Sequence, residues 1–589
     1  MKKEILQLRD KMKENNIDIY YVPSGDYHSS EYVNDYFKCR EFLSNLSGEA
    51  GELIVNEEGA YLWTDGRYFL QAETQLAGTE IELMRMAEPG VPTIEEFLQE
   101  YASRRKGCTL GFDGRVLPAS TGKSLESMLK EYDVKIKYDK DLAGEVWTTR
   151  PAIVPSELFE LPISSVGVTA VDKVKAVREE MKSRGADYLL LTDLMEIAWI
   201  TNMRGRDIAY TPVFFAYALV SQDDFRLFVM DGAVKNNLPE SMSFVTLSNY
   251  DEIDTALAEI PADKKLWLNN DSANYTLSKI CDVVADGKNI INDMTPVTLM
   301  KILKNDEEIK STVNAHIKDG VAMVNFIAWL KENVSNGELT EIDAADYLQK
   351  CRFAQEGCFD LSFETISGYG PNGAIIHYAP TEESNAVIKP EGFLLMDSGG
   401  QYMDGTTDIT RTIAVGPLTQ EMIDNYTYVL KSHLAMILMD VPKEMNGVEL
   451  DKHVRKPLRD VGKDFKHGLA HGVGHILSVH EGPNTLRRVA KPIEFKPGMI
   501  MSDEPGVYID GKYGIRIENE LLFVDKGNGD MKLRNLTYCP YEPDAINKEL
   551  LNEDEIAWLN AYNKEVRETL KPLIEDYAQN YLVEATKEI

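Results

Sequence analysis

The stretch HGLAHGVGHILSVH, residues 467–480, holds four of the protein's nine histidines: His467, His471, His475 and His480. Imidazole changes its protonation near neutral pH and is the commonest metal-binding side chain. Because packing alone does not account for so dense a run, we interpret it as part of a functional site. Its meaning depends on which other segments of the chain come close to it.

The composition is that of an ordinary globular protein with several domains. The chain has 589 residues, of which 43% are hydrophobic and 27% charged, which is enough for three or four domains. The net charge of −33 argues against nucleic acid or an anionic membrane as a partner, because both require a basic surface.

The compartment is predicted from the N-terminus and the cysteines. The first residues, MKKEILQLRDKMKENNID, are too charged for a signal peptide, and no apolar run approaches the roughly 18 residues of a membrane span. The six cysteines are scattered without a CxxC pair, which argues against a disulfide framework or a zinc–thiolate site. We therefore expect a cytoplasmic protein.

An internal repeat indicates two copies of one α/β module. Residues 8–26 (LRDKMKENNIDIYYVPSGD) and 177–195 (VREEMKSRGADYLLLTDLM) both read as an amphipathic helix, a polar break and an apolar strand. Three residues recur in register, and the matched pairs are Arg9 with Arg178, Met12 with Met181, and Lys13 with Lys182.

We divide the chain into four regions on these patterns. Two modules occupy 1–147 and 148–300, and the Pro-rich segment 150–162 reads as a linker near their junction. From 301 the sequence has helical periodicity for more than thirty residues, as two helices or one long one, and a third region of strands and helices runs to 530. The remainder, 531–589, is a charged helical extension with an apolar stripe at Trp558, Leu559 and Tyr562.

Strand-like segments of the third region carry isolated acids. Asp397 ends the apolar strand GFLLMDSGG, and Asp408 follows in TTDITRT after a turn, so that an antiparallel hairpin would bring the two carboxylates together. Glu504 ends the strand MIMSDE before Pro505, and Glu518 is expected in the middle of the strand GIRIENELLFV.

Four buried carboxylates require counter-charge, and two divalent cations would supply it. One imidazole among carboxylates suits manganese, cobalt or zinc better than calcium. A lone strand acid, or a lone histidine such as His28, His316, His433 or His453, is more often structural. Only the set as a whole indicates a metal site.

The ordered motifs HYAP, MDSG, TTDITRT, HGLAHGVG, VHEGP, DEPG and GIRIEN resemble those of the metal-dependent "pita-bread" peptidases. Taken with the two modules and the tail, the whole chain resembles the three-domain cytosolic Xaa-Pro aminopeptidase (aminopeptidase P) family. The resemblance implies an α/β (α+β) fold, with two creatinase-like N-terminal modules, a pita-bread catalytic domain and a helical tail.

The resemblance also implies a dinuclear centre and its ligands. Two divalent ions, usually Mn²⁺ with Co²⁺ or Zn²⁺ as alternatives, would be bound by five residues: Asp397, Asp408, His471, Glu504 and Glu518. Asp408 and Glu518 would bridge the ions, and a hydroxide shared by the two metals would attack the X-Pro bond.

Roles for the neighbouring residues follow from the same motifs. Glu504 is the implied general base, and His480 would hydrogen-bond the substrate carbonyl or the tetrahedral intermediate. His467 and His377 would line the pocket and position the substrate, and Arg516 and Tyr508 would orient Asp397. Two further residues complete the set: Arg67 matches a family position that reaches the active site, and His475 receives no role.

The expected activity is release of the N-terminal residue from peptides with proline in position two, by a homodimer. A prolidase that cleaves only Xaa-Pro dipeptides is the alternative enzyme, although prolidases usually have one N-terminal module. A non-catalytic peptide-binding or chaperone-like module is the alternative of another class. It is disfavoured because all five ligand positions hold the expected residue types.

Overall fold

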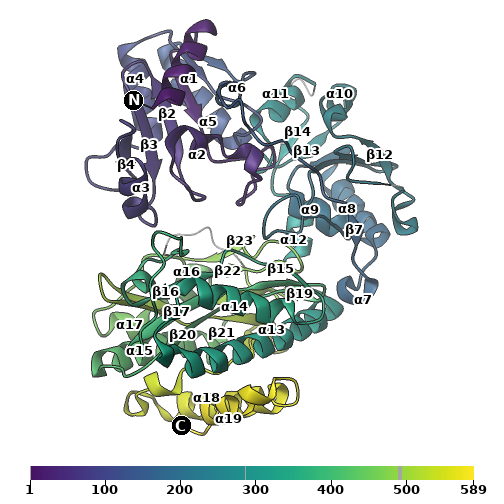
Figure 1. Cartoon of the computed structure of the whole chain (residues 1–589). Helices are drawn as coiled ribbons and strands as arrows, with labels where there is room; N and C mark the ends of the chain where they lie inside the picture. Colours follow the sequence, from purple (N-terminus) through teal and green to yellow (C-terminus); the bar gives the residue numbers. More distant parts are fainter. Residues whose placement is uncertain (1, 236, 285–286, 489–493) are drawn as a thin grey trace. The chain divides into compact units, whose positions relative to one another are not determined.

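Two sheets with one strand order build the N-terminal part of the computed structural model, which describes residues 2–235, 237–284, 287–488 and 494–589. The chain divides into two compact units. The N-terminal unit comprises Met1–Glu160, Thr169–Ala209 and Val213–Val297, and the C-terminal unit comprises Leu161–Val168, Tyr210–Pro212 and Thr298–Ile589. Both units appear in Figure 1.

The first sheet of the N-terminal unit has β1 near its centre. β1 pairs antiparallel with β2 and parallel with β5, and β3 and β6 lead outward to the sheet edges. In spatial order its strands are β4 (Glu82–Arg85), β3 (Ala60–Thr64), β2 (Glu52–Asn56), β1 (Ile19–Val22), β5 (Thr109–Gly111) and β6 (Lys135–Lys137).

The second sheet repeats this arrangement strand for strand, with the same parallel and antiparallel neighbours. Its strands in order are β12 (Thr246–Asn249), β11 (Phe225–Val229), β10 (Ala216–Ser221), β8 (Tyr188–Leu191), β13 (Leu266–Leu268) and β14 (Ile290–Asn292). A short pair, β7 (Phe159–Glu160) with β9 (Met203–Arg204), lies outside it. The predicted duplication of an α/β module is therefore confirmed.

Helices cover these sheets with apolar faces. In α1 (Lys3–Glu14), Ile5, Leu8 and Met12 recur every three or four residues and are all buried, as the helical period requires. Met181 of α8 (Ala170–Arg184) is buried like its counterpart Met12. The other helices are α2 (Cys39–Ser44), α3 (Phe69–Gln75), α4 (Ile94–Arg104), α5 (Ala119–Leu129), α6 (Leu142–Val146), α9 (Leu194–Thr201), α10 (Ile253–Ala258), α11 (Tyr275–Val284) and α12 (Pro296–Lys301), the last of which continues into the C-terminal unit.

A buried histidine joins the two modules of the N-terminal unit. The His28 ring places Nδ1 2.8 Å from the carbonyl oxygen of Thr192 and Nε2 2.6 Å from the hydroxyl of Tyr250. A carbonyl only accepts, so Nδ1 carries the proton and Nε2 accepts from Tyr250. Burial lowers the pKa of His28 to about 4, which keeps the ring neutral at physiological pH.

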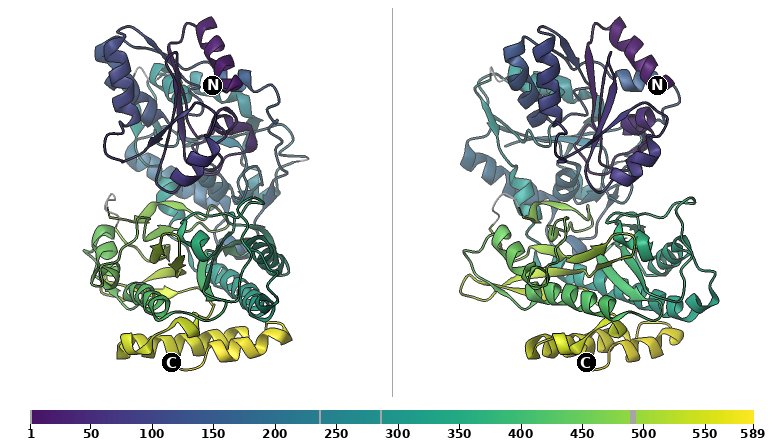
Figure 2. Two further views of the ribbon diagram at one scale, coloured as in Figure 1. Left: turned by 60° about the vertical axis from the view of Figure 1, so that its left-hand side comes forward. Right: turned by 90° about the vertical axis from the view of Figure 1, so that its left-hand side faces the viewer.

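The strands of the C-terminal unit lie in several small sheets and one larger sheet (Figure 2). The small sheets contain β15 (Cys358–Leu361), β18 (Gly400–Tyr402) and β19 (Gly405–Thr406); β16 (Ile366–Tyr369), β17 (Phe393–Ser398) and β20 (Ile409–Ala414); and β25 (Gly506–Ile509) with β26 (Tyr513–Arg516). The larger sheet has the order β21 (Asp440–Val441), β28 (Met531–Asn535), β27 (Asn519–Asp525), β24 (Ile500–Asp503), β22 (Ala470–Gly472) and β23 (Glu481–Leu486).

After residue 301 the sequence is compatible with two helices or one long helix, and the structure has one long helix. α13 (Asp306–Asn333) runs for 28 residues from a capping box formed by Asn305 and Glu308. The other helices of this unit are α7 (Ile163–Val166), α14 (Glu341–Phe353), α15 (Gln420–Ile437), α16 (Gly447–Val454), α17 (Lys456–Arg459), α18 (Glu553–Leu570) and α19 (Gln579–Ala585).

The C-terminal extension packs on its own unit as a pair of helices. α18 and α19 both contact α13, and Figures 1 and 2 show them side by side along one face of this unit. Leu559 and Tyr562 are buried, and Trp558 is partly buried against them, so the predicted apolar stripe faces the core.

One expectation about strands is confirmed and one needs correction. Asp397 and Asp408 lie on the two arms of one antiparallel hairpin, since β17 pairs with β20 and β18 pairs with β19 in the same register around the turn at Met403 and Asp404. Glu518 is not in the middle of a strand: it lies between β26, which pairs with β25, and β27, which pairs with β24. The chain changes sheets at this residue, which a continuous apolar pattern does not reveal.

All six cysteines lie in the described part of the chain and are free thiols. No helix among the described residues is both long and apolar enough to cross a membrane.

The buried His28 makes the stability of the N-terminal unit depend on pH. Its folded pKa lies below the unfolded value, so the full contribution is present above pH 6.5 and is lost as the pH falls toward 4. Relative to a His28→Phe variant, the wild type should lose roughly 2 kcal/mol of unfolding free energy between pH 7 and pH 5. Urea titrations at the two pH values measure this, with the exposed His453→Gln as control. A constant difference between wild type and His28→Phe would contradict the assignment.

Candidate metal centre

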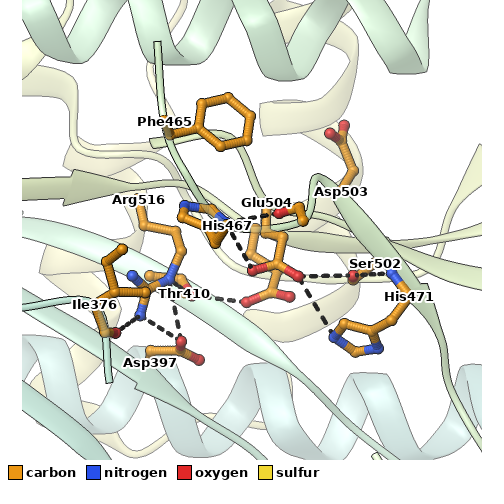
Figure 3. Close-up of polar contacts among 12 residues, drawn as sticks. Ile376, Asp397, Thr410, Phe465, His467, His471, Ser502, Asp503, Glu504 and Arg516 are labelled. Atoms are coloured by element: carbon orange, nitrogen blue, oxygen red, sulfur yellow. Dashed lines mark hydrogen bonds and ion pairs between the residues drawn. The ribbon is translucent and has the colours of Figure 1, made fainter. Parts of the chain in front are cut away.

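Four acids from separate strands meet at one point of the C-terminal unit. Asp397 lies in β17 and Asp408 immediately before β20; these strands pair antiparallel, with Asp397 opposite Thr410. Glu504 follows the last residue of β24, and Glu518 lies at the change of sheet. The backbone N–H of Glu518 donates to the Thr410 carbonyl at 3.2 Å, which ties this point to β20. Figure 3 shows the side chains of Asp397 and Glu504 with their polar contacts.

His471 brings the histidine-rich segment to the acids. It lies in β22, next to β24, and its Nε2 is 3.4 Å from Oδ2 of Asp408 and 3.6 Å from Oε1 of Glu504. Its Nδ1 lies 2.9 Å from the carbonyl of Gly472, so in the neutral tautomer the proton is on Nδ1. The Nε2 lone pair then faces carboxylate oxygens, an arrangement that a cation between these atoms satisfies.

Three carboxylate oxygens at this point are buried and have no hydrogen-bond donor among the described residues: Oδ1 of Asp397, Oδ1 of Asp408 and Oε1 of Glu518. Burial, followed by the charges of the neighbouring acids, raises the pKa of Asp408, Glu504 and Glu518 well above the usual range. Asp408, His471 and Glu518 each offer a ligand atom, and these atoms lie within 4.8 Å of one another. The residues therefore fit divalent metal ions.

An arginine compensates part of the negative charge. Arg516 places Nη2 2.6 Å and Nε 3.1 Å from Oδ2 of Asp397, and both side chains are almost fully buried. Its Nη1 donates to the hydroxyl of Tyr508 at 2.8 Å. This pairing leaves Oδ1 of Asp397 available for a metal.

Tyr508 connects Arg516 to His467 through hydrogen bonds of its hydroxyl group. Its hydroxyl accepts from Arg516 and lies 2.8 Å from Nε2 of His467, so the hydroxyl proton points at the ring. Nδ1 of His467 lies 2.6 Å from the Gly468 carbonyl and 3.8 Å from Oε2 of Glu504. Burial, then the charge of Arg516, lowers the pKa of His467 well below the usual value, which keeps this ring neutral beside Glu504.

His480 and His377 interact with residues that surround the acids. The His480 ring meets the His471 ring edge to face, with centroids 4.4 Å apart. His377 is exposed and follows Ile376, whose carbonyl accepts from Arg516. Its charge contributes to the lowered pKa of His467, so the two rings are close enough to interact electrostatically.

Two other residues singled out from the sequence have different partners. His475 is buried between the hydroxyl of Thr312, 3.1 Å from Nδ1, and the carbonyl of Ser165, 2.8 Å from Nε2, and therefore ties α13 to the segment 161–168. Arg67 is part of the N-terminal unit, where Asp65 binds its guanidinium through contacts of 2.9 and 2.7 Å.

Two hydroxyls that the sequence did not single out also contact the acids. Thr410 donates to Oε2 of Glu518 at 2.7 Å, and Ser502 links the backbone of His471 to Oε1 of Glu504 by contacts of 3.1 and 3.3 Å. The alternation of β20 already places Thr410 on the face of Asp408. Ser502 has no comparable pattern, since its partner lies 31 residues away.

Family models match four consecutive parts of the chain. A creatinase/prolidase N-terminal domain matches residues 5–142 and again 149–308. Metallopeptidase family M24 matches 311–525, and the C-terminal region of peptidase M24 matches 530–589. The expected fold, two creatinase-like modules followed by a pita-bread domain, is confirmed.

Relatives with the same architecture match over nearly the whole length. A probable Xaa-Pro aminopeptidase P from Laccaria bicolor is 38% identical, over 97% of this chain and 90% of the relative. Xaa-Pro aminopeptidase 1 from Dictyostelium discoideum is also 38% identical, over 97% and 94%. The crystal structure of X-prolyl aminopeptidase from Caenorhabditis elegans, described as a cytosolic enzyme with a di-nuclear active site, is 31% identical with a TM-score of 0.94, covering 100% of this chain and 99% of that one. The chain therefore belongs to the Xaa-Pro aminopeptidase (aminopeptidase P) group of metallopeptidase family M24.

Proposed function

We propose that the protein is a metal-dependent exopeptidase that releases the N-terminal residue from peptides with proline in the second position. The observation that carries this proposal is the convergence of Asp397, Asp408, His471, Glu504 and Glu518, with three buried carboxylate oxygens lacking a donor among the described residues. These five residues would hold two divalent ions. Mn²⁺ is our choice, because a single imidazole among carboxylates suits it, with Co²⁺ or Zn²⁺ as alternatives.

The chemistry suits a bond to proline. An X-Pro bond is a tertiary amide without an N–H, so an enzyme cannot rely on a hydrogen bond to that group. Two divalent ions, when bound, would supply Lewis acidity toward the peptide carbonyl and acidify the attacking water. Neither contribution needs an N–H at the cleaved bond.

The protein's own residues would handle the protons and the substrate. Glu504 would accept the proton of the water, since burial raises the pKa of its carboxyl group. His480, against the His471 ring, would donate to the substrate carbonyl or tetrahedral intermediate. His467 and His377 would line the pocket, and Arg516 with Tyr508 would hold Asp397 in orientation.

Further parts of the proposal concern the whole molecule. We propose a homodimer in the cytoplasm, supported for the compartment by the description of the C. elegans relative as cytosolic. Arg67 is proposed to contribute to a substrate site, and for that its pairing with Asp65 would have to open. The regions 1–147, 148–300, 301–530 and 531–589 remain our proposed domain boundaries.

Two alternative functions, a prolidase and a non-catalytic binding module, can be distinguished from the proposed aminopeptidase. A prolidase would use the same metal site but accept only dipeptides. A non-catalytic binding module would not need the ligands, yet all five positions hold side chains able to bind metal. Relatives that match this chain over 97% of its length are named aminopeptidases, which favours the first proposal.

Replacing Glu504 with Ala should reduce kcat/KM at least about a thousandfold, because one side chain serves as metal ligand and general base. The far-UV circular dichroism spectrum should remain that of the wild type. Glu338→Ala, a change of an exposed glutamate in the same unit, should leave the activity unchanged. Substantial activity in a purified Glu504→Ala protein would exclude the assigned base.

Removing the metals should abolish activity and lower the melting temperature, more at pH 7 than at pH 5. In the metal-free protein the raised pKa of Asp408, Glu504 and Glu518 means that folding takes up protons, so stability falls as the pH rises above the ordinary carboxyl range. Mn²⁺ should restore activity at least as well as Zn²⁺. Restoration by Zn²⁺ alone would refute the manganese assignment.

The Mn²⁺-loaded enzyme should cleave the first bond of a short X-Pro-X peptide and release its N-terminal residue. It should leave the matched X-Ala-X peptide largely intact, and an X-Pro dipeptide should not be the preferred substrate. Mass spectrometry of the products and N-terminal sequencing provide the measurement. Strong preference for the dipeptide would establish the prolidase instead, and no cleavage of any X-Pro peptide would favour a binding module.

A further inference from the structure

A fifth acidic side chain, that of Glu520, lies beside the four acids and is not one of the proposed ligands. Glu520 of β27 has a fully buried side chain, two residues after Glu518. Its Oε1 accepts the backbone N–H of Asp408 at 2.8 Å. A carboxylate next to four others costs free energy through mutual repulsion, so its position calls for an explanation.

The Glu520 carboxylate accepts a hydrogen bond that the backbone N–H of Asp408 would otherwise lack. The ladder between β17 and β20 ends at the pair of Ser398 and Ile409, so the amide of Asp408 lies just beyond it. An unsatisfied buried amide costs roughly 1–3 kcal/mol and leaves the peptide plane free to turn. Glu520 supplies the missing acceptor and fixes the peptide plane from which the Asp408 side chain projects.

Glu520 is itself held from two sides. Its backbone N–H donates to the hydroxyl of Thr537 at 2.9 Å. Its Oε2 lies 3.2 Å from Nε2 of His316 in α13, at an angle outside hydrogen-bond geometry, and the His316 side chain is 2% exposed. His316 thus contacts the carboxylate oxygen that does not accept the Asp408 amide.

The other end of β20 offers an internal comparison. The side chain of Glu542 accepts the N–H of Ala414 at 3.1 Å and pairs with Lys331 of α13 at 2.8 Å. Both glutamates are buried, both accept an amide at an end of β20, and both face a basic side chain of α13. Only Glu520 acts on a proposed metal ligand.

We propose that Glu520, held by His316, is a positioning residue that fixes the backbone of Asp408 and thereby sets the affinity of the centre for its metal ions. The proposal rests on the proposed function of that centre. It attributes to Glu520 an effect on metal binding that is separable from its effect on folding, and it assigns the acceptor oxygen, rather than the negative charge, as the cause.

Titration of the metal-free, full-length protein with Mn²⁺ by calorimetry tests this. Glu520→Met removes the acceptor at similar volume and should weaken binding of at least one ion by about tenfold or more, the usual effect of residues that orient ligands. Its kcat should recover at high Mn²⁺ concentration, with the KM for the peptide unchanged. Glu520→Gln keeps an acceptor oxygen and should stay within about threefold of the wild type.

The matched control is Glu542→Met, which should lower the melting temperature but leave Mn²⁺ affinity unchanged. Wild-type affinity in Glu520→Met, or equal loss in Glu520→Gln and Glu520→Met, would overturn the positioning role. If Glu520→Met does not melt cooperatively, His316→Met decides: weakened Mn²⁺ binding supports the proposal, and unchanged binding refutes it. A wild type that binds no divalent ion would instead refute the metal centre itself.

Discussion

Mutual repulsion among Asp397, Asp408, Glu504 and Glu518 is the constraint on which the C-terminal unit depends. Each of these carboxylates would be stable alone on a surface, but burial, followed by mutual repulsion, raises the pKa of Asp408, Glu504 and Glu518 well above the usual range. The group also has buried oxygens without a hydrogen-bond donor among the described residues. The only cationic side chain that contacts this group through a short ion pair in the described chain is Arg516, which binds one oxygen of Asp397. The remaining charge is what divalent ions would balance, so metal binding and stability of this unit are coupled.

The sheets are arranged to meet that constraint. Glu518 lies where the chain leaves one sheet for another, so its side chain can reach Thr410 and the centre while its backbone follows neither ladder. Behind it, the buried Arg411 donates to the carbonyls of Thr410 and Glu518 and to the hydroxyl of Tyr562 in α18. Because it uses carbonyl and hydroxyl acceptors, Arg411 stiffens the backbone without occupying a ligand oxygen. The tail helix therefore contributes to the support of the site.

Much of this organisation follows from local sequence, and the exceptions share one cause. Periodicity and the repeat of Arg9, Met12 and Lys13 at 178, 181 and 182 predict the two modules, because each sheet is built from nearby segments. The position of Glu518 at a sheet crossing and the task of Glu520 could not be predicted. Both depend on partners about a hundred or more residues away, Thr410 and Asp408, and His316 lies farther still. Such contacts are decided by tertiary packing rather than by periodicity.

The histidines of the segment 467–480 differ in which ring nitrogen carries the proton. His467 and His471 each place Nδ1 against the carbonyl of the glycine that follows, which leaves Nε2 as the acceptor in both rings. The glycine at 472 is required for a further reason, since a Cβ there would meet the Glu481 carbonyl at 2.4 Å. His475 is followed by Ile476 and is bound the other way, with Nε2 donating to Ser165 and Nδ1 accepting from Thr312. Both nitrogens of the His475 ring are engaged by the protein, which leaves no lone pair for a metal, whereas Nε2 of His471 faces the carboxylates of Asp408 and Glu504.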